Sequence, residues 1–196
     1  MSDIATKLPP RLNARAGAVA LALGAPMNLL LHLQGARLAP LAYAAWLVFS
    51  FGALCFAGEM GAERPLNRAG LVAFAAAFCA DTVALVAAGA EARARLLYAF
   101  CLLAALLFWS VALMHRARTA RAVGSVGAAL GGAAIALLIA AHLLVGTATI
   151  AGFSQLFAAL GDPGQATAGA LLAIDAVACL WAFAVAILLW RGQLRA

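Results

Sequence analysis

Few residues of this sequence could do chemistry, and they stand alone inside long apolar segments. Asp81 occurs in FCADTVALV and Asp175 in LLAIDAVACL, Asn28 and His32 share the stretch NLLLH, and His142 lies in a further apolar segment. Carboxylates and imidazoles can carry protons or ligate cations. Asn28 and His32 are one helical turn apart, so in a helix they share one face. We take these five as the candidate ion-, proton- or substrate-binding residues.

Composition indicates that these residues belong to a membrane protein. Of the 196 residues, 67% are hydrophobic and 10% are charged, and the mean hydropathy is +1.04. Soluble domains carry roughly 25% charged residues. The apolar residues come in runs of about twenty, the length that a helix needs to cross about 30 Å of hydrocarbon. The sequence therefore predicts an all-α integral membrane protein.

Six apolar spans can be placed along the chain. We expect them at about 16–35, 38–58, 69–90, 96–114, 122–146 and 168–190, which makes residues 16–190 one six-transmembrane-helix bundle. The connection 147–167 is the longest, and in it Ile150, Phe153, Phe157 and Leu160 recur at spacings of three and four. This spacing predicts a short interfacial helix before the last span. The alternative is an irregular continuation of the fifth span.

Basic residues predict how the bundle is oriented, because Lys and Arg in short loops are retained in the cytoplasm. One side of a six-span arrangement carries Arg37, Arg93 and Arg95; the other carries Lys7, Arg11, Arg15, Arg64, Arg68, Arg116, Arg118, Arg121, Arg191 and Arg195. Both termini, residues 1–15 and 191–196, are therefore expected in the cytoplasm. We expect a multi-pass protein of the cell membrane, specifically a bacterial inner membrane. The basic N-terminal segment also suits a secretory signal, but the apolar run after it is longer than a signal core.

The net charge of +6 is accounted for by this membrane edge, where basic residues meet anionic lipid. Membrane lipid is thus an expected partner, and nucleic acid is not.

The two aspartates are predicted to lie deep in the membrane. Asp81 is about nine residues from the outer end of the third span, or about 14 Å along a helix, and Asp175 is roughly 10 Å deep in the sixth. His32 and His142 lie closer to the outer ends of their spans. All four fall in the outer half, where the aspartates need a partner or a proton. The alternatives are a structural hydrogen bond between helices for the aspartates and ordinary interfacial positions for the histidines.

Glycines of the fifth span predict close helix packing. Gly127 and Gly131 form one small-residue row, and Gly124 and Gly132, with Ala128 between them, form a second. Such rows allow two helix backbones to approach closely. The fifth helix is therefore expected either at the centre of the bundle or at a seam with another copy or with other subunits of a larger membrane complex. In the first span, Gly24 is expected to admit a close neighbour and Pro26 to kink the helix.

Aromatic residues near span ends usually lie at the membrane interface. Trp109, Trp190, Tyr43 and Tyr98 are assigned to that class, whereas Trp181 is deep enough to pack in the core. Cys55, Cys79, Cys101 and Cys179 are isolated in four spans and have no metal-ligand spacing.

Three functions remain open. The first is a transporter or channel component for a small solute, cation or proton that uses Asp81 and Asp175. The second is an accessory or structural subunit of a larger membrane complex. The third is a redox subunit in which His32 and His142 ligate haem b, or a metal ion together with the aspartates; no cofactor is required by the first two. H-E-x-x-H, G-x-S-x-G and Walker motifs are missing, so an enzyme is not favoured.

Overall fold

A computed structural model describes residues 10–34, 39–61, 64–86, 91–116, 118–147 and 163–194. The described residues form six α-helices, which are α1 (Pro10–Gln34), α2 (Ala39–Met60), α3 (Pro65–Val86), α4 (Glu91–Met114), α5 (Arg118–Thr147) and α7 (Pro163–Trp190). Each contains a segment long and apolar enough to cross a membrane. The described part of the chain is thus all-helical, and its six apolar helices indicate a polytopic membrane protein, as the hydropathy predicts.

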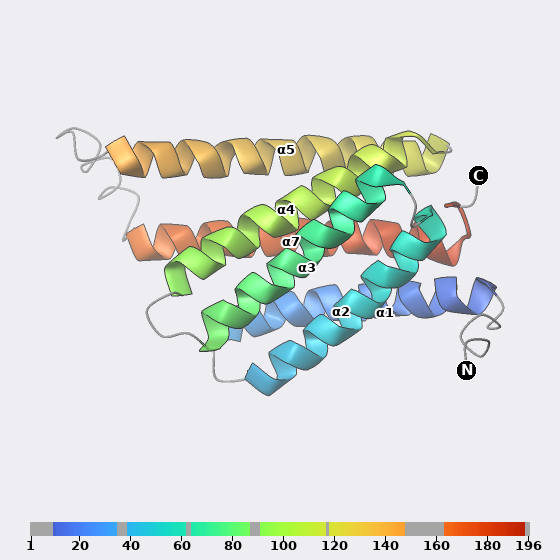
Figure 1. Cartoon of the computed structure of the whole chain (residues 1–196), viewed down its shortest axis with the longest axis horizontal. Coiled ribbons are helices and arrows are strands. Elements are labelled where there is room, and N and C mark those ends of the chain that lie inside the picture. Colours follow the sequence, from blue (N-terminus) through green and yellow to red (C-terminus); the bar gives the residue numbers. More distant parts are fainter. Residues whose placement is uncertain are drawn as a thin grey trace.

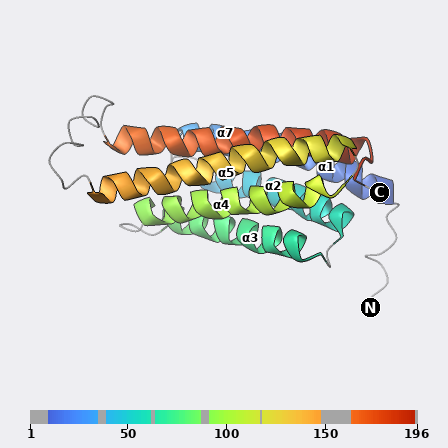
Figure 2. The same ribbon diagram turned by 90° about the horizontal axis from the view of Figure 1, so that it is seen from above.

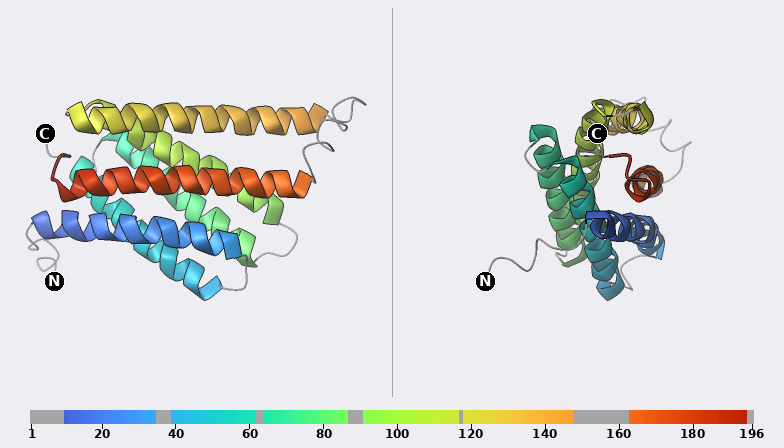
Figure 3. Two further views of the ribbon diagram at one scale, coloured as in Figure 1. Left: turned by 180° about the vertical axis from the view of Figure 1, so that it is seen from behind. Right: turned by 90° about the vertical axis from the view of Figure 1, so that its right-hand side faces the viewer.

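The helices form two crossed layers. α1, α7 and α5 run side by side in one layer, and α2, α3 and α4 cross them obliquely in the other (Figures 1 and 2). We call the end of the bundle where α1 begins and α7 ends the near end, and the opposite end the far end. Figure 3 shows the bundle from behind and with the near end toward the viewer. Successive helices run in opposite directions between these two ends.

The helices differ from the predicted apolar spans mainly in the residue at which each begins. α3, α4 and α5 begin at Pro65, Glu91 and Arg118, four or five residues before the spans, because polar residues continue a helix beyond the hydrocarbon. α7 begins at Pro163, inside the segment 147–167 that we expected to connect two spans, since proline suits the first turn of a helix. The expected interfacial helix falls mostly on residues 148–162, which lie outside the described residues.

The side chains of Asn67 and Arg116 donate hydrogen bonds to backbone carbonyls at the near end of α2. Gly61 follows α2 with a φ of 87°, the left-handed conformation that suits glycine after a helix. The Asn67 amide donates to the Ala57 oxygen at 2.7 Å and the Gly61 oxygen at 2.9 Å, and the Arg116 guanidinium donates to the Met60 oxygen at 2.6 Å. Burial and the neighbouring Arg64 charge lower the pKa of Arg116. These bonds satisfy carbonyls that the end of a helix leaves unpaired.

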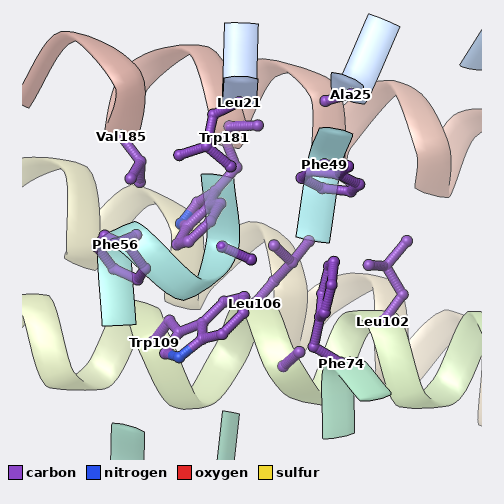
Figure 4. Close-up of a cluster of buried hydrophobic side chains, with 14 of the residues drawn as sticks. Leu21, Ala25, Phe49, Phe56, Phe74, Leu102, Leu106, Trp109, Trp181 and Val185 are labelled. Carbon is purple, nitrogen blue, oxygen red and sulfur yellow. The ribbon is translucent and has the colours of Figure 1, made fainter. Parts of the chain in front are cut away.

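Aromatic rings fill the core between the layers. Trp109 stacks on Trp181 with ring centroids 5.8 Å apart and planes 12° apart, and Phe56 meets both rings edge-on. Figure 4 shows these rings together with Phe49 and Phe74 at the centre of the bundle. The interfacial assignment was therefore wrong for Trp109 and Tyr98, which are only 1% and 2% exposed. Trp181 packs in the core as expected.

Glycines set the distance between α1 and α2. A Cβ atom added at Gly24 would lie 2.5 Å from the Phe49 backbone nitrogen, and one added at Gly52 would lie 2.7 Å from the Leu21 backbone nitrogen. Any side chain at either position would push the helices apart. The close neighbour that we expected at Gly24 is thus α2.

α5 lies at the edge of the bundle beside α4 and α7 (Figure 3). Only 17% of its span is buried, against 33% to 56% for the other helices, so the expected central position is wrong. Among its glycines, Gly124 faces the Ser110 carbonyl and Gly127 faces Ser110 and Trp181, each too closely to admit a Cβ. Gly131 makes only ordinary contacts, and a Cβ at Gly132 would meet nothing within 4 Å. The close approach is therefore made by Gly124 and Gly127, one residue from each predicted row, and not by Gly131 or Gly132.

Candidate functional site

A network of buried polar side chains joins five helices in the far half of the bundle. It consists of Asn28 on α1, Trp46 on α2, Asp81 on α3, Tyr98 on α4 and Asp175 on α7, and we call it the central polar network. Asn28, Asp81 and Asp175 are 3%, 5% and 4% exposed. The first four residues lie five to seven positions from the far ends of their helices, or about 8–11 Å along a helix axis.

Tyr98 links three helices of this network. Its hydroxyl donates a hydrogen bond to Asp175 Oδ1 and accepts one from the Asn28 amide at 3.4 Å. Its ring packs edge-on against Trp46 with centroids 6.0 Å apart. Because Tyr98 is on α4 while Asn28 and Asp175 are on α1 and α7, the phenol is a polar contact between the two layers.

Asp81 joins the network through Trp46. The Trp46 indole N–H donates to Asp81 Oδ2 at 2.6 Å, and the Trp46 ring lies edge-on against the Tyr98 ring. Burial of a carboxylate in hydrocarbon is costly unless hydrogen bonds or a countercharge compensate. Both aspartates thus have strong donors, from an indole and a phenol on neighbouring helices.

The five side chains contain more acceptor oxygens than N–H and O–H donors. Two carboxylates supply acceptors only when ionised, whereas the donors are one indole, one phenol and one amide. Asn28 Oδ1 is buried and has no hydrogen-bond partner among the described residues. Buried carboxylates in such a group can accept a proton or hold a small cation.

The two histidines cannot be placed against this network. His32 lies one turn beyond Asn28 in α1, and His142 lies in the last third of α5, but both side chains are outside the described part of the structure. Among the side chains that are described, no group of three or more His, Cys, Asp and Glu residues could hold a metal ion. The haem and metal assignments of His32 and His142 therefore stay predictions.

A second cluster of polar side chains lies toward the near end. Trp109 Nε1 donates to Asn67 Oδ1 at 3.1 Å, and Trp181 Nε1 donates to Ser110 Oγ at 2.9 Å. Asn67 also donates to the end of α2, as described above, so all three of its strong hydrogen-bonding groups are used. This near-end cluster links α2, α3, α4 and α7 by hydrogen bonds.

Sequence reasoning found three members of the central polar network and missed two. Asn28, Asp81 and Asp175 stand out because polar side chains are costly inside apolar spans. Tyr98 and Trp46 do not stand out, because a Tyr or Trp near a span end occurs equally at an interface. The available signal was their position: both lie seven residues inside a helix, far enough to reach the aspartates.

Comparison with known proteins adds nothing to this geometry, since no family model, curated protein or solved structure matches the chain.

Proposed function

We propose that the protein is a transporter or channel component of the cell membrane that binds a proton or a small cation at Asp81 and Asp175. One observation carries the proposal: Asp81 of α3 and Asp175 of α7 are both buried and accept hydrogen bonds from Trp46 and Tyr98, whose rings are in contact. The buried Asn28 Oδ1 on the neighbouring α1 has no hydrogen-bond partner among the described residues. A purely structural pair of hydrogen bonds would not need a second carboxylate or an unsatisfied amide oxygen at the same place.

Charge in this network can affect how the two layers pack. Protonation of Asp175 would change its bond to Tyr98, and with it the polar contact between α4 and α7. α4 packs much less extensively against α7 than against α3, so fewer contacts oppose a rearrangement of α4 relative to α7. A proton or cation taken up here therefore has a direct route to an altered helix arrangement.

Orientation and location complete the proposal. The near end, which carries most of the basic residues, faces the cytoplasm, and the membrane is a bacterial inner membrane. The central polar network then lies in the outer half, within reach of ions that enter from outside.

Flux across liposomes tests the proposal. The full chain is reconstituted with an indicator dye inside that senses the ion under test, and H⁺, Na⁺ and K⁺ gradients are imposed in turn. We expect flux of at least one of these ions that Asp81→Asn and Asp175→Asn each abolish, while Glu59→Gln, at the near end of α2, conducts normally. Asn can still accept the hydrogen bonds of Trp46 or Tyr98, so these variants should fold. Equal flux in all four proteins would make the site assignment wrong.

A second candidate function is an accessory subunit of a larger membrane complex, or a homo-oligomer. The observation that favours it is the edge position of α5, whose residues Val126, Leu130 and Ile139 are exposed. Native mass spectrometry of the protein extracted in mild detergent tests this candidate. A stoichiometric companion or a second copy would support it, and a monomer alone would oppose it.

A further inference from the structure

An apolar groove runs along the outside of the bundle between α1 and α7, on the other side of these helices from the aromatic core. It has a volume of about 360 Å³ and is lined by Ala18, Val19 and Ala22 of α1 and by Phe183, Ile187 and Trp190 of α7. Ala18 and Ala22 are too small to fill the space at the contact, while Val19, Phe183, Ile187 and Trp190 are exposed and form its walls. The groove is thus open to lipid.

Two arginines stand at the near end of this groove. Arg191 is part of its lining, and the Arg15 guanidinium lies over the Trp190 ring, 5.5 Å from the centroid. Arg15, Ala18, Val19 and Ala22 are spaced by three, four and seven residues, so they share one face of α1. The apolar groove therefore continues directly into a pair of positive charges.

No acidic side chain of the two helices offsets these charges. α1 contains no Asp or Glu, and the one acidic residue of α7, Asp175, is about four helical turns from Arg191. An apolar channel that ends in guanidinium groups matches a molecule with a hydrocarbon chain and an anionic head. Guanidinium groups bind phosphate oxygens especially well, because their N–H donors form a planar fork.

We propose that the groove between α1 and α7 binds one anionic phospholipid, with an acyl chain along Ala18, Ala22 and Phe183 and the phosphate between Arg15 and Arg191. Trp190 stands at the level of the head group, the position that membrane tryptophans favour. The lipid belongs to the leaflet at the near end of the bundle. This site is separate from the central polar network, which lies in the far half.

Native mass spectrometry of the full chain in detergent, titrated with phosphatidylglycerol or phosphatidylcholine, tests the proposal. We expect one phosphatidylglycerol to bind more tightly than the rest, and phosphatidylcholine to show no such site. Arg15→Gln/Arg191→Gln should weaken this binding roughly tenfold or more, since each basic residue near a membrane surface contributes about 1 kcal/mol to anionic-lipid binding. Arg64→Gln/Arg118→Gln removes the same charge from exposed positions at the near end and should bind as the wild type does.

A second variant tests the groove itself. Ala22→Phe leaves every charge in place but fills the apolar channel, so it should also weaken phosphatidylglycerol binding. Equal losses of phosphatidylglycerol binding in the two double arginine variants would show that the charged edge attracts the lipid in general. This result would overturn the proposal. Unchanged binding in Ala22→Phe, or equal binding of phosphatidylcholine, would overturn it as well.

Discussion

Tyr98 is the residue on which the candidate site depends most. Its hydroxyl donates to Asp175 and accepts from Asn28, and its ring lies against Trp46. One side chain on α4 therefore holds polar groups of α1 and α7 and touches α2. A phenol suits this place because it combines a large apolar ring with one hydroxyl that both donates and accepts.

Removal of this hydroxyl should destabilise the fold. In Tyr98→Phe the Asp175 carboxylate and the Asn28 amide lose their shared partner while the ring remains, and buried polar groups left without a partner cost about 1–3 kcal/mol. Unfolding in mixed micelles measures the loss. Tyr43→Phe is the control, since Tyr43 lies only half-buried near the start of α2 and should tolerate the change. Equal stability of the two variants would show that the phenol is not a structural link.

Asn67 should matter to stability and not to ion binding. Asn67→Ala removes two bonds to the end of α2 and the acceptor of Trp109, so a loss of about 2–4 kcal/mol is expected from several buried groups left unpaired. Any ion flux, measured in the surviving folded protein, should keep the wild-type ion preference. A changed preference would place the near-end cluster on the ion path.

At the scale of residues, the sequence predicts the costly groups but not their partners. Asp81, Asp175 and Asn28 stand out because each is polar in an apolar span. Their donors Trp46 and Tyr98 could not be named, because hydropathy gives the depth of a residue and not the rotation of its helix.

At the scale of helices, small residues decide which pairs can pack closely. Gly24 and Gly52 face backbone atoms of the opposite helix, whereas Gly58 faces open space. Hydropathy predicts that six helices exist, and the small-residue pattern predicts close packing, but neither says which neighbour is used. The fifth span shows this: its glycine rows predicted either a central helix or a seam with another chain, and α5 lies at the edge of the bundle.

Two glycines of one helix make a matched test. Gly52→Ala would place a Cβ 2.7 Å from the Leu21 backbone nitrogen, which cannot move without α1, so overpacking of about 1–3 kcal/mol is expected. Gly58→Ala makes the same change in α2 where nothing lies within 4 Å, and it should be neutral or slightly stabilising. The measurement is the unfolding midpoint of each variant. Equal midpoints would contradict the close contact of α1 with α2.

At the scale of the molecule, two crossed layers are joined by polar contacts at two depths. In the near-end cluster, Asn67 uses both amide hydrogens and its oxygen in hydrogen bonds, whereas the central polar network holds two buried carboxylates and an unsatisfied Asn28 Oδ1. This difference makes the far half the candidate for ion binding. It also predicts that the near end is the more rigid end.

The orientation of the whole bundle can be tested by fusions to the C-terminus. Green fluorescent protein fused after Ala196 should fluoresce, and alkaline phosphatase at the same position should be inactive, because we expect the near end in the cytoplasm. The opposite pattern would put the central polar network in the inner half and reverse the side from which ions enter.

The most direct test of proton binding in the proposed function is an infrared spectrum of the purified protein. Protonated carboxylic acids have a carbonyl band of their own, and we expect such a band in the wild type that loses intensity in Asp81→Asn and in Asp175→Asn. The spectrum of Glu59→Gln should keep it. A band that is unchanged in both aspartate variants would contradict proton binding by the central polar network.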